Sequence, residues 1–124
     1  MELAVKAPLN KTESSDKLLR AVENLFPSLE FKEKGGFLQS KGSDRNDLAA
    51  FKELLKLQQI QDTAKAFLNG SIDGERMIFE LNKQAAYMGK VNFVDFPIAL
   101  GTIIVEIKDR DPEALIDWLT LKDS

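Results

Sequence analysis

The stretch Leu81–Phe93 reads Leu-Asn-Lys-Gln-Ala-Ala-Tyr-Met-Gly-Lys-Val-Asn-Phe and follows directly on a predicted strand. Four long or amide side chains lie among its small and apolar residues: Lys83, Gln84, Lys90 and Asn92. Gly89 can act as a hinge, because glycine adopts backbone conformations that other residues avoid. This mixture suits a surface that holds a polar partner, and it lacks the acid, base or nucleophile set of an active site.

Alternating patterns on both sides of this stretch predict β-strands. Apolar and polar residues alternate, as in strands with one buried face, over residues 2–7, 29–33, 37–41, 76–81 and 102–108. Gly35-Gly36 separates the second and third of these segments, which predicts a hairpin.

Apolar residues at helical spacing predict the helices, over residues 13–26, 48–68 and 112–119. Thr12 and Asp111 are the predicted caps of the first and last helices, and Asn69-Gly70 is the predicted left-handed end of the middle one. Glutamines interrupt the apolar stripe of residues 48–68, which favours a kink or two successive helices. Residues 82–89 predict a short helix or an ordered turn.

The order of these elements predicts an α+β fold, with a mainly antiparallel sheet and helices packed on one face. The first six elements follow the split βαβ arrangement of ferredoxin-like folds, which a further strand and a C-terminal helix extend. A chain of 124 residues fits one domain, so we expect residues 1–124 to form a single α+β domain.

The composition argues against most kinds of catalysis. The chain contains no cysteine and no histidine, so a thiolate nucleophile, a histidine base and the usual zinc ligands are all excluded. Asp109 and Asp111 could offer two carboxylates to Mg²⁺, but a polar turn with Asp111 as helix cap is the favoured interpretation. We therefore expect a protein that is not an enzyme, with no catalytic residue, no metal and no cofactor.

The formal net charge of −3 limits how the chain can bind a nucleic acid. Dedicated nucleic-acid binders are usually basic, because neutralising phosphates supplies much of their affinity. RNA binding would need a local basic face, and we expect no DNA partner. No apolar run approaches the length that spans a bilayer and no signal peptide is visible, so we expect a cytoplasmic protein without a membrane partner.

Two familiar nucleotide and RNA motifs are matched only in part. Gly89-Lys90 resembles the end of a phosphate-binding loop, but Gln84 and Val91 stand at positions which that loop needs for other residues. Phe93 and Phe96 echo the aromatic end of the RNA-recognition-motif signature, whose earlier positions are not matched. Both phenylalanines are better interpreted as core or interface residues.

Two interpretations of residues 82–93 remain open. In the first, Lys83 and Lys90 contact phosphate while Gln84 and Asn92 bind sugar or base edges of structured RNA. In the second, the segment is structural: Asn82 and Asn92 satisfy backbone groups and Gly89 permits a tight turn. Phe93 and Phe96 then pack at the interface of a homodimer.

Residues 81–93 resemble the signature of an archaeal family, uncharacterised protein family 0201, which carries an RNA-binding description. The resemblance extends over nearly the whole chain, through Val5–Pro8, Ala21–Pro27, Asp62–Ala64, Leu100-Gly101 and Glu113–Leu119. The motif positions fall on Asn82, Lys83, Gln84, Gly89, Lys90 and Asn92. The resemblance implies an archaeal cytoplasmic protein that forms homodimers, with a fold similar to the ribosomal protein of the large subunit that binds 5S RNA.

Overall fold

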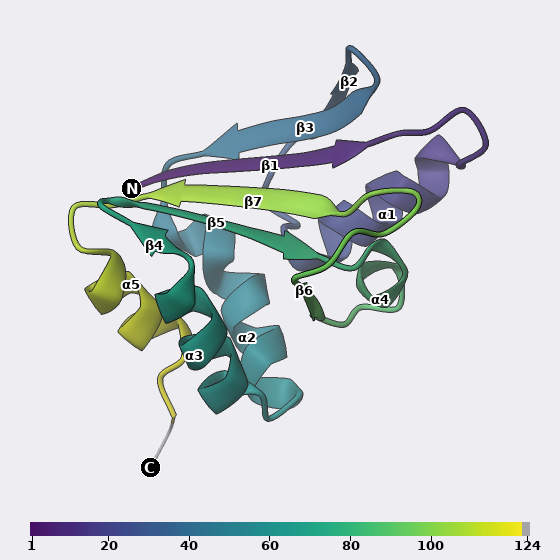
Figure 1. Ribbon diagram of the computed structural model, residues 1–124. Helices are drawn as coiled ribbons and strands as arrows, with labels where there is room; N and C mark the ends of the chain where they lie inside the picture. Colours follow the sequence, from purple (N-terminus) through teal and green to yellow (C-terminus); the bar gives the residue numbers. More distant parts are fainter. Residues whose placement is uncertain (123–124) are drawn as a thin grey trace.

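Seven β-strands form one antiparallel sheet in the computed structural model, which describes residues 1–122 (Figure 1). The strands are β1 (Glu2–Pro8), β2 (Lys32–Lys34), β3 (Phe37–Gly42), β4 (Ile72–Asp73), β5 (Arg76–Leu81), β6 (Phe93–Val94) and β7 (Ile103–Lys108). The α-helices are α1 (Ser15–Leu25), α2 (Ala49–Leu57), α3 (Gln61–Gly70), α4 (Lys83–Tyr87) and α5 (Pro112–Leu119), and a 3₁₀ turn, η1 (Arg45–Leu48), precedes α2. The predicted α+β class is confirmed.

The predicted split βαβ start is confirmed, because β3 lies between β1 and β2 and is antiparallel to both. The position of the further strand, β7, could not be predicted. The sheet order is β2-β3-β1-β7-β5-β4, with β6 also paired to β5, so the last long strand lies between β1 and β5. Both neighbours are antiparallel to β7. The strand that extends the predicted unit is thus central to the sheet, where its inward Val105 lies between the buried side chains of Val5 in β1 and Phe79 in β5.

Several element boundaries differ from the predicted ones for local reasons. Ser14, not Thr12, caps α1, since the Ser14 hydroxyl accepts a hydrogen bond from the Lys17 backbone N–H. Gln59 adopts a left-handed conformation with φ of 56°, which ends α2 and separates it from α3. Helix α3 includes Gly70, which is not left-handed. Strands β4 and β6 have two residues each, which is too short to show the alternation of apolar and polar residues that predicts a strand.

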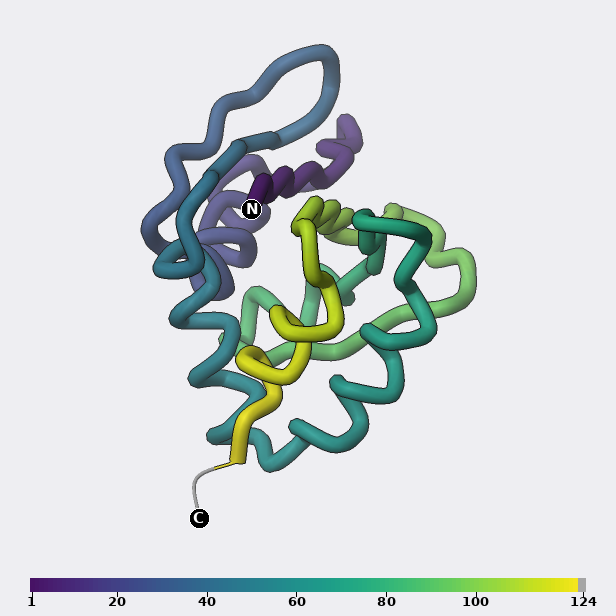
Figure 2. The backbone as a smooth tube through the Cα atoms, turned by 90° about the vertical axis from the view of Figure 1, so that its left-hand side faces the viewer, coloured from purple at the N-terminus to yellow at the C-terminus, as the bar shows by residue number. Residues whose placement is uncertain are grey.

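The hydrophobic core lies between one face of the sheet and the helices. In Figures 1 and 2, α2, α3 and α5 are on the same side of the sheet. Phenylalanine rings join the layers: Phe51 is stacked on Phe26 with centroids 5.8 Å apart and also contacts Phe79 of β5 at 5.9 Å. No helix within residues 1–122 is long and apolar enough to cross a membrane.

Candidate nucleic-acid interface

Helix α4 and the residues after it form a closed segment that holds the motif positions. The Asn82 side chain accepts a hydrogen bond from the Ala85 backbone N–H at 2.9 Å and so caps the helix. The Asn82 N–H donates to the Asn92 carbonyl at 2.9 Å, which brings the two ends of the segment together. Both asparagines therefore contribute to the shape of the segment, one with its side chain and the other with its backbone.

Gly89 ends α4 in the left-handed region, with φ of +75°. The Gly89 N–H donates to the Ala86 carbonyl and the Lys90 N–H donates to the Ala85 carbonyl, at 2.9 and 2.8 Å. These two bonds form a Schellman motif, in which glycine is favoured because it has no Cβ. A Cβ at Gly89 would meet no atom within 4 Å, so the requirement for glycine here is one of backbone conformation and not of space.

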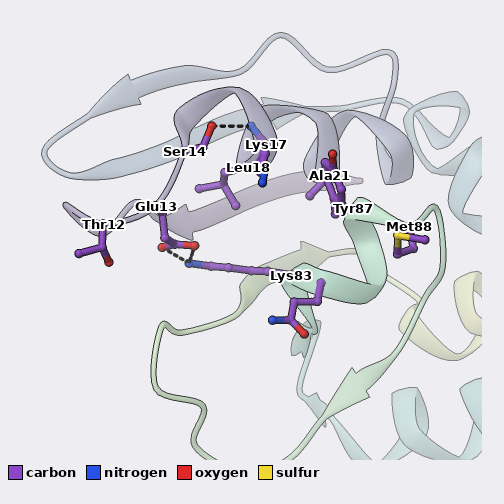
Figure 3. A pocket seen from close by; sticks show the side chains of 10 residues that line it. Thr12, Glu13, Ser14, Lys17, Leu18, Ala21, Lys83, Tyr87 and Met88 are labelled. Atoms are coloured by element: carbon purple, nitrogen blue, oxygen red, sulfur yellow. Dashed lines mark hydrogen bonds and ion pairs between the residues drawn. The ribbon is translucent and has the colours of Figure 1, made fainter.

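The side chain of Lys83 points into the protein (Figure 3). Its ammonium group donates to the Pro8 carbonyl at 2.6 Å, to the Leu100 carbonyl at 2.7 Å and to the Glu13 carboxylate at 2.9 Å. An ammonium has three N–H donors, and three acceptor groups engage them. Only 10% of the Lys83 side chain is exposed. A phosphate contact by Lys83, as predicted, would require this lysine to leave all three partners.

The Glu13 carboxylate is the negative centre of the same cluster. Burial raises its pKa, but the hydrogen bonds from Lys83 and Asn10 and the positive charge of Lys83 outweigh burial, so the pKa of Glu13 is lowered. The Asn10 side-chain amide donates to Glu13 at 2.6 Å and to the Leu100 carbonyl at 2.9 Å. The cluster therefore joins the end of β1, the residues before α1, helix α4 and the loop before β7.

The other three predicted RNA-contacting side chains, Gln84, Lys90 and Asn92, are exposed. Phe93 instead turns inward: its ring stacks on Phe67 with centroids 4.8 Å apart and meets Phe79 at 5.9 Å. Phe93 thus packs within its own chain, whereas Phe96 is 64% exposed. The segment therefore has an exposed polar side and an inward side on which Phe93 packs against the aromatic rings of the core.

A groove lies beside the exposed side of this segment, between the start of α1 and α4 (Figure 3). It has a volume of about 590 Å³, and its lining includes Lys17, Gln84 and Tyr87. The Arg20 guanidinium lies 5.4 Å from the centre of the Tyr87 ring. We call this the α1–α4 groove. Lys17 and Arg20 were not predicted from the sequence, although their spacing of three residues places them on one side of the helix.

Two half-buried amides hold the segment against the rest of the fold. The Asn24 side chain of α1 donates to the carbonyls of Ala86 and Tyr87 at 2.9 and 3.2 Å. Gln58, after α2, donates to the Val91 carbonyl at 3.0 Å and accepts from the Val91 N–H at 2.7 Å. The exposed side chains are therefore presented from a fixed backbone.

The two carboxylates considered for Mg²⁺ make local hydrogen bonds. Asp111 caps α5 by accepting from the Ala114 N–H at 3.0 Å, and Asp109 accepts from the Asp111 N–H at 2.9 Å. Across the described residues, no group of three or more acidic, cysteine or histidine side chains is placed to hold a metal ion.

The chain matches one family model and is similar to archaeal proteins of one family. A family model described as RNA binding matches residues 2–108. A UPF0201 protein of Thermococcus kodakarensis is 40% identical over 122 residues, covering 95% of this chain and 88% of the relative. A UPF0201 protein of Pyrococcus horikoshii is 39% identical over 123 residues, covering 95% of this chain and 88% of that one.

A solved structure is similar along the entire chain. The crystal structure of a UPF0201 protein from Methanococcus jannaschii covers 100% of this chain and 96% of its own, with a TM-score of 0.82 and 30% identity. The predicted likeness to the 5S-RNA-binding ribosomal protein stays a prediction. The chain belongs to the family whose model is described as RNA binding and, with its archaeal relatives, to the UPF0201 family.

Proposed function

We propose that the protein binds RNA and acts as a binding module, not as an enzyme. The observation that carries the proposal is the match of residues 2–108 to a family described as RNA binding. The geometry of the motif segment supports it, because Gln84, Lys90 and Asn92 are exposed on a backbone held by partly buried hydrogen bonds. Preorganised polar groups lose little conformational entropy when they bind a partner.

The α1–α4 groove extends the predicted contact surface. Lys17 and Lys90 would neutralise phosphates, and Gln84 would hydrogen-bond sugar or base edges. Tyr87 is half-buried with Arg20 over its ring, an arrangement that also suits stacking of an unpaired base. Lys83 takes no part in this version of the site and serves to position α4 through Glu13.

Binding to structured archaeal RNA across a salt series tests this proposal. We expect Lys17→Ala/Lys90→Ala to weaken binding and to reduce the slope of log affinity against log salt by about 1 to 2, since each lost phosphate contact removes roughly 0.7 to 0.9. The matched control is Lys65→Ala/Lys122→Ala, which removes the same charge at residues paired with Asp117 and Asp62. Equal affinities for the two double variants, or no binding by the wild type at low salt, would contradict the proposal.

A homodimer is the second candidate, in which the protein acts as an interaction module. Phe96 is 64% exposed, Leu100 45% and Ile78 41%. Phe96 lines a groove of about 440 Å³ together with Ile104 of β7 and Ile98. Sedimentation equilibrium of the wild type and of Phe96→Ser tests this: a dimer that Phe96→Ser weakens supports the candidate, and a monomer at high concentration rejects it.

A further inference from the structure

On the face of the sheet that points away from the helices, the strand register places side chains of neighbouring strands in rows. Lys6 of β1 pairs with Gln39 of β3 on one side and with Ile104 of β7 on the other. Lys32 of β2 pairs with Gln39, which continues the same row to the edge of the sheet. Since successive side chains of a strand alternate between faces, Lys34 and Lys41 also lie on this outward face.

Positive charge is concentrated on one half of this face. Strands β2, β3 and β1 carry Lys32, Lys34, Lys41 and Lys6 there, and all four side chains are exposed. Glu33 alternates to the opposite side of β2. Glu2 is on the outward face at the start of β1, where it pairs with Lys108 and lines a groove together with Lys41. We call the four lysines the lysine face.

The other half of the outward face differs because its charges are largely paired. Glu106 of β7 accepts from Arg76 at 3.3 Å and lies 3.9 Å from Lys108. In contrast, among residues 1–122 no carboxylate oxygen lies within 4.0 Å of an ammonium group of the lysine face. These four lysines therefore form no ion pair within 4.0 Å in the described part of the chain, although Glu2 and Glu106 line the same groove as Lys41.

The backbone holds the lysine face in a fixed arrangement. Gly35 and Gly36 have φ of 59° and 80°, and this two-residue turn ties β2 to β3 in register. The Lys6 ammonium lies 4.0 Å from the centre of the Phe37 ring, which supports its position above the sheet. Lys32 and Lys34 are about 7 Å apart along β2. Lys32 and Lys6 lie on either side of Gln39 in one row, which separates them by two strand spacings, about 10 Å.

We propose that the lysine face binds the backbone of single-stranded RNA. Unneutralised lysines attract a polyanion through the release of its counterions, and four of them in two dimensions match several consecutive phosphates better than one small anion. An uncovered sheet is a known shape for binding an extended strand, whereas the phosphates of a duplex are divided between two strands around a cylinder. The inference rests on RNA binding as the function and adds a site distinct from the α1–α4 groove.

Fluorescence anisotropy with a labelled single-stranded RNA of mixed sequence tests the proposal. The test variant is Lys32→Ala/Lys34→Ala/Lys41→Ala, and the matched control is Lys65→Ala/Arg110→Ala/Lys122→Ala. Each changes the formal net charge from −3 by three units to −6. We expect the test variant to bind about tenfold more weakly and its salt slope to fall by about 2, as three lost contacts predict, and the control to keep wild-type affinity.

The possible results separate this inference from the proposed function. If the test variant binds as well as the wild type while Lys17→Ala/Lys90→Ala does not, RNA binding stands and the lysine face is rejected. If the test variant and the control lose the same affinity, the effect is one of net charge, and the lysine face is also rejected. Tighter binding of duplex than of single-stranded RNA overturns the assignment to a single strand. Absence of binding by the wild type at low salt overturns the proposed function itself.

Discussion

At the scale of single residues, the Lys83 cluster shows how a lysine becomes part of a fold. Burying an ammonium is costly unless a counter-charge and hydrogen-bond acceptors replace its water. Glu13 supplies the charge, and the Pro8 and Leu100 carbonyls supply the remaining acceptors. No buried side-chain nitrogen or oxygen atom among the described residues lacks a hydrogen-bond partner. The cluster thus joins segments that are far apart in the sequence.

Replacing Lys83 should therefore destabilise the fold. We expect Lys83→Met to lower the free energy of unfolding by about 3 kcal/mol, since it leaves the Glu13 carboxylate without its buried partner. Lys90→Met, at an exposed position in the same segment, should change it by less than about 0.5 kcal/mol. Urea unfolding followed by circular dichroism measures both values, and equal stabilities of the two variants would contradict the structural role of Lys83.

The lowered pKa of Glu13 predicts a dependence of stability on pH. Below the ordinary glutamate pKa of about 4.3 the unfolded chain takes up a proton that folded Glu13 resists, so its stabilisation is present above that pH and is lost as the pH falls through the lower pKa of the folded state. We expect the wild type to be more stable than Glu13→Gln near neutral pH, and this difference to shrink in acid. Urea unfolding at about pH 6 and about pH 3 tests it. A difference that is the same at both pH values would contradict the assignment.

At the scale of elements, α4 is a helix of five residues whose ends are fixed by side chain and backbone conformation. So short a helix is not stable by itself, because nucleation costs more than its few hydrogen bonds return. Asn82 satisfies its first turn, the Schellman motif at Gly89 satisfies its last carbonyls, and Asn24 reaches across from α1. The motif residues are therefore held in position by hydrogen bonds within the segment and by one from α1.

Two glycines allow a matched test of this description. Gly89→Ala should destabilise the protein by about 1 kcal/mol, because a left-handed residue with a Cβ is strained even where space is free. Gly70→Ala, at the end of α3 where φ is not positive and nothing lies within 4 Å, should stabilise it by about 0.5 kcal/mol. Thermal unfolding of both variants gives the comparison, and the same sign of change for both would contradict it.

At the scale of the whole molecule, one hydrophobic core cluster includes buried residues from the long strands and from all five α-helices of the described chain. The central position of β7 lets its inward residues contact both halves of the sheet's covered side. We therefore propose that the chain is a single domain, as its length predicted.

A single domain should unfold in one cooperative transition. Trp118, the only tryptophan, lies in α5, so its fluorescence reports on the helical layer, while far-ultraviolet circular dichroism reports on the whole secondary structure. We expect the two signals to give the same urea midpoint and the same slope, because the core connects both layers. Two separated transitions would show that part of the chain unfolds independently.

Local sequence patterns were sufficient for most of the fold. The alternation in β1, β5 and β7, the stripe of α1 and the cap at Asp111 depend on neighbours a few residues away, so they could be predicted. Boundaries such as Ser14 and the two-residue strands β4 and β6 were missed. Thr12 and Ser14 both carry a hydroxyl that can cap a helix, so residue type alone does not choose between them. Strands β4 and β6 exist only through their pairing with β5.

The sequence by itself determined the α+β class, the break between α2 and α3, and the motif that marks the family, because each is written in residues that are close along the chain. Only the tertiary structure decided that Lys83 points inward, since Glu13 and Pro8 are 70 and 75 residues away from it. It alone placed β7 between β1 and β5 and brought the lysines of three strands onto one uncovered face. Strand register and charge pairing are set by contacts between distant segments, which no local pattern records.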